Sequence, residues 1–262
     1  MPPAAERPAP EAARRVFEAL LLPGIIDVLS REGSIQGEEM AGQIFGAGPI
    51  PPEWTDLVAR IHDPGVMERT LLTALTQELA GRDAAAMAAF FETEPGRSIV
   101  ARELAAREAM LSPDEEMAAK EAAAVAMAAS DPRLDLLRRY IDAADVIDSN
   151  VASAMNANHA YLMALLDGGA LGDGTTGSDV TGDVWAQEAR IRAETTEWVY
   201  AFLLKAYEDV PDADIEALIA FTESPAGRDL THALNAAFDR LYIEISRTLG
   251  LAAAHYMTTR QI

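Results

Sequence analysis

The chain has 262 residues, no cysteine, and a formal net charge of −21 that arises from 42 acidic and 21 basic side chains. Because this charge repels phosphate backbones and anionic lipid surfaces, it argues against binding to nucleic acids or membrane surfaces. The lack of cysteine excludes disulfides, thiolate metal sites and cysteine nucleophiles.

The pattern of apolar residues predicts an all-α protein. Alanine-rich segments and apolar residues at helical spacing dominate, and alternating β-branched runs are almost missing. Residues 1–10 are rich in proline and alanine, and we expect a disordered lead there, with no signal peptide in it. We also expect no membrane span, because no apolar run approaches the roughly 20 residues that a span needs.

In chain order, the first predicted helix covers residues 11–32 and is kinked or broken at Pro23. Ser34 is expected to open a short helical piece that ends in the proline-rich loop 46–52. Two apolar helical patterns then fill residues 51–79.

The middle of the chain contains a strong helix start at Ser112, where a capping serine is followed by a proline and two acidic residues. The alanine-rich stretch that it opens ends at Ala129. We then predict one helix over 131–167, longer than about 50 Å, that spans both halves of the molecule. Residues 168–182 are rich in glycine and acidic residues and should form a mobile loop.

An internal repeat organises the sequence. The stretch 90–97 (FFETEPGR) returns as 221–228 (FTESPAGR), 131 positions later, and the same offset carries Trp54 onto Trp185. Seven of seventeen positions are identical between 81–97 and 212–228. The repeat predicts an internally duplicated helical bundle, with a first helical repeat at 11–129 and a second at 130–262.

Each copy of the repeat predicts a helix, a sharp corner and a second helix. In the second copy Ser224 can cap the helix that Pro225 begins. The first copy has Glu94 where the second has a proline, which allows a differently built corner. We expect the aromatic residues to fill the angle between the two helices. The residues assigned to these structural corners are Phe90, Gly96, Arg97, Phe221, Ser224, Pro225, Gly227 and Arg228.

The second copy, between two amphipathic helices of an acidic chain, resembles the bacterial family known as domain of unknown function 2059. The mark of that family is an aromatic residue followed by Ser-Pro-x-Gly and a basic or amide residue. The resemblance covers residues 183–249 well and residues 54–110 weakly. It implies an all-helical fold and export across the inner membrane, and it implies no catalytic residues.

One helix carries residues suited to a metal. Met155, His159 and Met163 stand four residues apart, so they lie along one side of a helix, and thioether and imidazole groups suit Cu(I). The alternative is that they pack beside the apolar stripe of the same helix. A second candidate, for a divalent cation, is the acidic set Asp142, Asp145 and Asp148, whose alternative is a solvated surface.

No reaction signature is found: the sequence has no His-Glu-x-x-His motif, phosphate loop or Gly-x-Ser-x-Gly elbow. We therefore predict a non-enzymatic binding protein of the bacterial envelope without a cofactor. Its partner would be a protein or peptide held between the halves, and a homodimer is an open alternative. A carrier of a small ligand or metal, in a cavity between helices or on the Met/His stripe, is the second hypothesis, and a carboxylate-based hydrolase the third. The predicted location is periplasmic, with a cytoplasmic one as the alternative.

Overall fold

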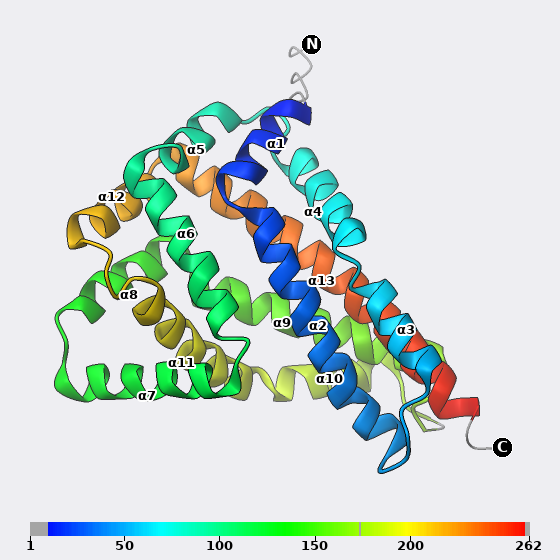
Figure 1. The fold of residues 1–262 in the computed structure, drawn as a ribbon. Helices are drawn as coiled ribbons and strands as arrows, with labels where there is room; N and C mark the ends of the chain where they lie inside the picture. Colours follow the sequence, from blue (N-terminus) through cyan, green and yellow to red (C-terminus); the bar gives the residue numbers. More distant parts are fainter. Residues whose placement is uncertain (1–9, 173, 260–262) are drawn as a thin grey trace.

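The computed structural model describes residues 10–172 and 174–259 (Figure 1). All regular secondary structure in these residues is helical, which confirms the all-α prediction. The expected disordered lead lies outside the described residues, except for Pro10, which begins the first helix. No helix in the described ranges is both long enough and apolar enough to cross a membrane.

The helices form two successive groups, with one helix between them. The first group comprises α1 (Pro10–Ala19), α2 (Leu22–Phe45), α3 (Pro52–Ile61), α4 (Pro64–Glu78), α5 (Ala84–Phe91) and α6 (Glu94–Ala109). Helix α7 (Pro113–Ala129) follows. The second group comprises α8 (Arg133–Ala143), α9 (Val146–Asp167), α10 (Gly177–Ala186), α11 (Glu188–Ala206), α12 (Asp212–Thr222) and α13 (Pro225–Thr259).

The contacts of the first group recur in the second. Helix α1 packs on α4 and α5, as α8 packs on α11 and α12, and α4 packs on α13 as α11 packs on α6. The guanidinium group of Arg15 on α1 binds both carboxylate oxygens of Glu92 at the end of α5. Arg139 on α8 binds Glu216 on α12 in the same way. The two groups thus pack on each other through matched pairs of helices, α4 with α13 and α11 with α6, while α7 packs mainly on α11.

Helix α13 is the longest helix of the described chain. Its 35 residues span about 50 Å, and it packs against α9 and also against α2, α3, α4 and α5 (Figure 1). Gly250 allows the close approach to α9, because a Cβ atom there would lie 2.5 Å from the carbonyl oxygen of Tyr161. A long helix that spans both halves therefore exists, but it is α13.

The predicted single helix over 131–167 is wrong. The chain breaks between α8 and α9 at Asp145, whose φ of 50° is left-handed. Aspartate tolerates this conformation better than most residues, because its short side chain can form local hydrogen bonds. Leu21, between α1 and α2, adopts the same conformation with a φ of 52°.

Three other predicted boundaries differ from the structure. The break expected at Pro23 comes slightly earlier, and Pro23 lies in the first turn of α2, where its missing N–H is not needed. Ser34 opens no new helix, since α2 continues to Phe45. The loop expected over 168–182 ends early, because Thr176 and Asp179 form a capping box that starts α10.

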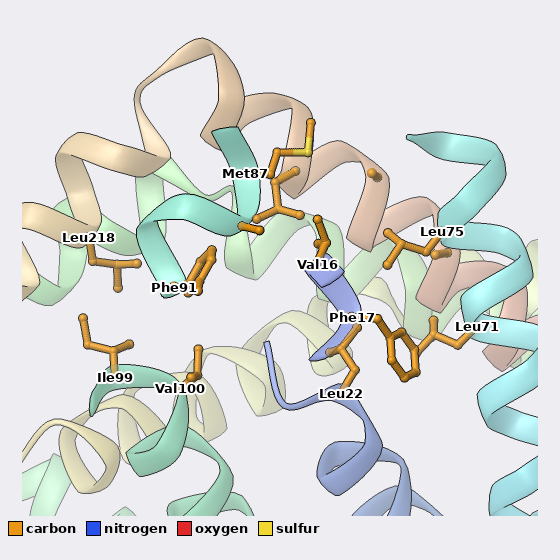
Figure 2. Close-up of a cluster of buried hydrophobic side chains, with 14 of the residues drawn as sticks. Val16, Phe17, Leu22, Leu71, Leu75, Met87, Phe91, Ile99, Val100 and Leu218 are labelled. Carbon is orange, nitrogen blue, oxygen red and sulfur yellow. The ribbon is translucent and has the colours of Figure 1, made fainter. Parts of the chain in front are cut away.

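The main core lies where the two groups meet. Side chains from α1, α4, α5, α6 and α12 converge there (Figure 2). Among them, Val16, Leu75, Met87 and Ile99 have no exposed surface. Burying one such side chain contributes about 1.5–3 kcal/mol to folding. This apolar junction holds α6 and α13 in the positions from which they form the cleft described below.

A smaller core surrounds Trp54. The rings of Phe45, Trp54 and Tyr256 meet edge to face at 5.4–5.7 Å, and the indole N–H donates to the carbonyl oxygen of Gly37 at 2.9 Å. Trp185, the counterpart of Trp54 in the sequence repeat, is 66% exposed. The repeat therefore does not give these two tryptophans equivalent surroundings.

Candidate ligand-binding cleft

The two predicted corners have the same cap. Thr93 Oγ1 accepts a hydrogen bond from the amide of Gly96 at 3.3 Å, and Ser224 Oγ accepts one from Gly227 at 3.1 Å. A Cβ atom at either glycine would lie within 2.2 Å of a backbone carbonyl oxygen, so both positions require glycine. The replacement of a proline by Glu94 leaves the corner unchanged, because the serine or threonine cap and the glycine determine its shape.

The remaining corner residues also match. Arg97 and Arg228 each donate to the carbonyl oxygen five residues earlier in the chain. Phe90 and Phe221 are half-buried and stack on each other, with ring centroids 4.7 Å apart and an interplanar angle of 9°. The two corners thus meet face to face, and each phenylalanine packs on its counterpart in addition to its own corner.

Two residues of the Met/His stripe, His159 and Met163, face α10. His159 Nε2 lies 3.3 Å from the hydroxyl of Thr181, and Met163 packs against Gly177. In the described ranges, no group of three or more His, Cys, Asp or Glu side chains is arranged to hold a metal ion, so His159 belongs to no such group. The same finding argues against the divalent-cation site proposed at Asp142, Asp145 and Asp148. Asp148 instead forms an ion pair with Arg192.

A cleft lined by residues that the sequence did not single out lies between α2 and α6 on one side and α9 and α13 on the other, with α11 as a third wall. It consists of two adjoining cavities. The first, called here the Glu103 cavity, has a volume of about 570 Å³. The second, called here the His62 cavity, has a volume of about 760 Å³. Arg107, Trp198 and Tyr242 line both cavities, so the two form one continuous cleft.

Arg107 lies where the two cavities join. Its Nη2 donates to Glu32 Oε2 at 2.7 Å, and its guanidinium group lies 4.7 Å above the ring of Trp198. Its Nε is buried and has no hydrogen-bond partner among the described residues. Burial raises the pKa of Tyr242, the charge of Arg107 lowers it and the charge of Glu32 raises it, so this side chain enters the cleft as a neutral hydroxyl.

Glu103 brings a carboxyl group with an unusual proton affinity into its cavity. The hydroxyl of Tyr207 donates to Glu103 Oε1 at 2.5 Å, and the ring of Tyr140 lies 6.1 Å from that of Tyr207. Burial raises the pKa of Glu103 to about 7, although the hydrogen bond from Tyr207 acts in the opposite direction. Burial and the charge of Glu103 raise the pKa of both tyrosines, which therefore remain protonated.

Asp239 of α13 contributes a second carboxylate to the Glu103 cavity. Its Oδ1 accepts hydrogen bonds from Ser153 at 3.0 Å and from Asn156 at 3.1 Å, both on α9. Aromatic rings form the adjoining walls: those of Trp198 and Phe202 on α11 stack at 5.1 Å, and α13 adds Phe238 and Tyr242. The cavity therefore combines broad apolar surfaces with a few oriented polar groups.

The buried histidine of the His62 cavity has a structural role. His62 Nδ1 lies 3.0 Å from the carbonyl oxygen of Val58, and burial lowers the pKa of the imidazole, which keeps it neutral. Gly33 makes room for the ring, because a Cβ atom there would lie 2.0 Å from it. Ser30 donates to the backbone oxygen of His62 and not to its ring, so no nucleophile–base pair forms.

Sequence reasoning missed the cleft because its residues are ordinary when taken one at a time. Glu103 and Arg107 are four residues apart on a helix, which is typical of a surface ion pair. One signal was present: α11 carries Trp198, Tyr200 and Phe202 within five residues of a chain that is only 6% aromatic.

No protein-family model, curated protein or solved structure matches this chain. The resemblance to the domain of unknown function 2059 family therefore stays a prediction. Function has to be argued from the geometry of the cleft, since a helical fold by itself implies no activity.

Proposed function

We propose that the protein is a non-enzymatic binding protein that holds a small organic molecule in the central cleft. The Glu103 cavity supports this proposal, because its volume of about 570 Å³ and its mainly apolar lining with a few polar groups are typical of small-molecule sites. A helix with its side chains is about 10–12 Å wide, so it suits these cavities less well. Binding of a protein or peptide, the first hypothesis from the sequence, thus becomes the alternative, and a homodimer stays a prediction.

Native mass spectrometry of gently purified protein, together with a thermal-shift screen of a diverse small-molecule library, tests the proposal. The matched control is Asn235→Trp, which should fill the Glu103 cavity without breaking a hydrogen bond, because the Asn235 side chain bonds to no other described residue. We expect a retained mass, or a ligand-induced rise in melting temperature, in the wild type and not in the variant. The proposal fails if no small molecule is retained and none stabilises the wild type.

A second candidate function, carboxylate-based hydrolysis, is favoured by one observation. The pKa of Glu103, raised to about 7, is suited to proton transfer at neutral pH, and Asp239 lines the same cavity. A screen of chromogenic glycoside and ester substrates tests this function. Turnover that Glu103→Gln abolishes would support it, and turnover that survives this substitution would exclude Glu103 as the working acid.

We further propose that the protein acts in the bacterial envelope and that its two helix groups are related by duplication. The family resemblance supports the location. The ungapped sequence repeat and the recurring helix contacts support the duplication. Osmotic-shock fractionation of cells that express the natural gene tests the location: release with periplasmic markers is expected, and co-fractionation with cytoplasmic markers would contradict it.

A further inference from the structure

The charges around the Glu103 cavity do not balance. Three charged side chains line it: Glu103, Arg107 and Asp239. Arg107 is neutralised by Glu32 through a 2.7 Å ion pair. Neither Glu103 nor Asp239 forms an ion pair with any of the described residues. The unpaired charge that an occupant of this cavity meets is therefore negative.

Each of these two carboxylates keeps one oxygen without a hydrogen bond. Glu103 Oε1 receives the hydroxyl of Tyr207, and Glu103 Oε2 bonds to none of the described residues. Asp239 Oδ1 receives Ser153 and Asn156, and Asp239 Oδ2 has no such partner. The neighbouring hydrogen bonds hold both side chains in place, so that the cavity has one free carboxylate oxygen on α6 and one on α13.

The aromatic walls, like the carboxylates, favour a positively charged occupant. Trp198, Phe202, Phe238 and Tyr242 line the cavity from α11 and α13, and aromatic rings attract cations. Arg107 already uses this attraction, with its guanidinium group over Trp198. A cation with an apolar body would satisfy both the rings and the free carboxylate oxygens.

We propose that the Glu103 cavity binds an organic cation: a primary amine on an aromatic or aliphatic body, with its positive charge attracted by the carboxylates of Glu103 and Asp239. This inference rests on the proposed small-molecule function and names its ligand class. An organic acid is the opposite alternative, because the buried Nε of Arg107 has no partner. Such an acid would lie beside two carboxylates that no described cation neutralises, and their repulsion opposes its binding.

The test uses isothermal titration calorimetry at pH 8 with tryptamine, tryptophol and indole-3-acetate, which share one ring system and differ in the charge of the end group. We expect tryptamine to bind at least about tenfold more tightly than tryptophol, and indole-3-acetate most weakly. Asp239→Asn should weaken the binding of tryptamine at least about tenfold. The asparagine oxygen can still accept the hydrogen bonds from Ser153 and Asn156. Glu244→Gln, at an exposed position of the same helix outside this cavity, removes the same charge and should change the affinity less than about twofold.

Glu103→Gln is the second variant if Asp239→Asn fails to fold, since glutamine still accepts the hydroxyl of Tyr207. Binding of the acid or the alcohol as tightly as the amine would overturn the inference and leave the proposed function intact. The same conclusion follows if none of the three probes binds while other compounds stabilise the wild type in the library screen. Failure of every compound in both experiments would instead remove the proposed function itself.

Discussion

Helices α6 and α13 start from corners of the same construction, yet they present different side chains to the cleft at matched positions. The offset of 131 residues carries Glu103 onto Leu234 and Arg107 onto Phe238, and all four side chains line the Glu103 cavity. At these matched positions α6 is charged and α13 is apolar, while Asp239 next to Phe238 adds a carboxylate from α13. The comparison indicates that caps and glycines fix where the helices lie, whereas the cleft-facing positions are free to differ and decide what the cleft can bind.

The largest expected effect concerns the corner glycines. In Gly96→Ala and Gly227→Ala the new methyl group would lie 2.2 and 2.0 Å from the carbonyl oxygens of Phe90 and Phe221, and these backbone atoms have little room to move. We expect each variant to lose on the order of 2–4 kcal/mol of unfolding free energy, measured by urea denaturation. Gly42→Ala, in α2 with no atom near its added methyl group, is the control and should be neutral or stabilising. A loss at only one corner would show that the two corners are not equivalent.

The second-largest expected loss of stability concerns the stacked rings of Phe90 and Phe221. Phe90→Ala and Phe221→Ala should each cost about 2–3 kcal/mol, at the lower end for phenylalanine because both rings are half-buried. A double-mutant cycle should give a coupling of about 0.5–1.5 kcal/mol, as expected for an aromatic pair. Trp185→Ala, at a side chain that is 66% exposed, should stay within about 0.5 kcal/mol. Additive losses would contradict the direct contact between the two corners.

Glu103→Gln tests the charged wall of the cleft. The pKa of Glu103 rises from 4.5 to about 7 on folding, so the folded state binds the proton more tightly. Protonation of Glu103 therefore contributes fully to the free energy of unfolding below pH 4.5. This contribution is lost as the pH rises through 7. Glutamine stays neutral, so the variant should match the wild type near pH 4.5 and exceed it by about 3 kcal/mol at pH 8.

Urea denaturation of Glu103→Gln across this pH range, beside the exposed control Glu244→Gln, provides the measurement. Arg107, four residues along α6, and Asp239 on α13 are the other charges that line the cavity with Glu103, and both are unchanged in the variant. A constant difference between variant and wild type at every pH would argue against the raised pKa.

The smallest expected effect is that of the capping hydroxyls. Thr93→Ala and Ser224→Ala should each cost about 1 kcal/mol, because each removes one acceptor from a free amide of a first helical turn. Similar losses measured by thermal unfolding would support the equivalence of the corners. A loss confined to Ser224→Ala would mean that the first corner depends on other contacts.

The sequence predicted those features that depend on neighbouring residues. A capping serine followed by a proline was enough to locate the helix start at Ser224 and Pro225, and the helical spacing of apolar residues predicted the all-α class. The break at Asp145 was missed, because an aspartate fits a helix about as readily as a left-handed turn, and packing between helices decides. Glu103 and Asp239 were missed because only the tertiary fold brings α6 and α13 to one cavity.

The position of helix α13 in the chain also affects when the protein can finish folding during its synthesis. It follows every other helix along the described chain, yet it covers α2, α3, α4 and α5 of the first group. Those helices leave the ribosome with their apolar faces open and stay that way until α13 has been made. A nascent chain should therefore remain sensitive to protease and available to chaperones well past the midpoint of translation, and acquire resistance only when this last helix docks.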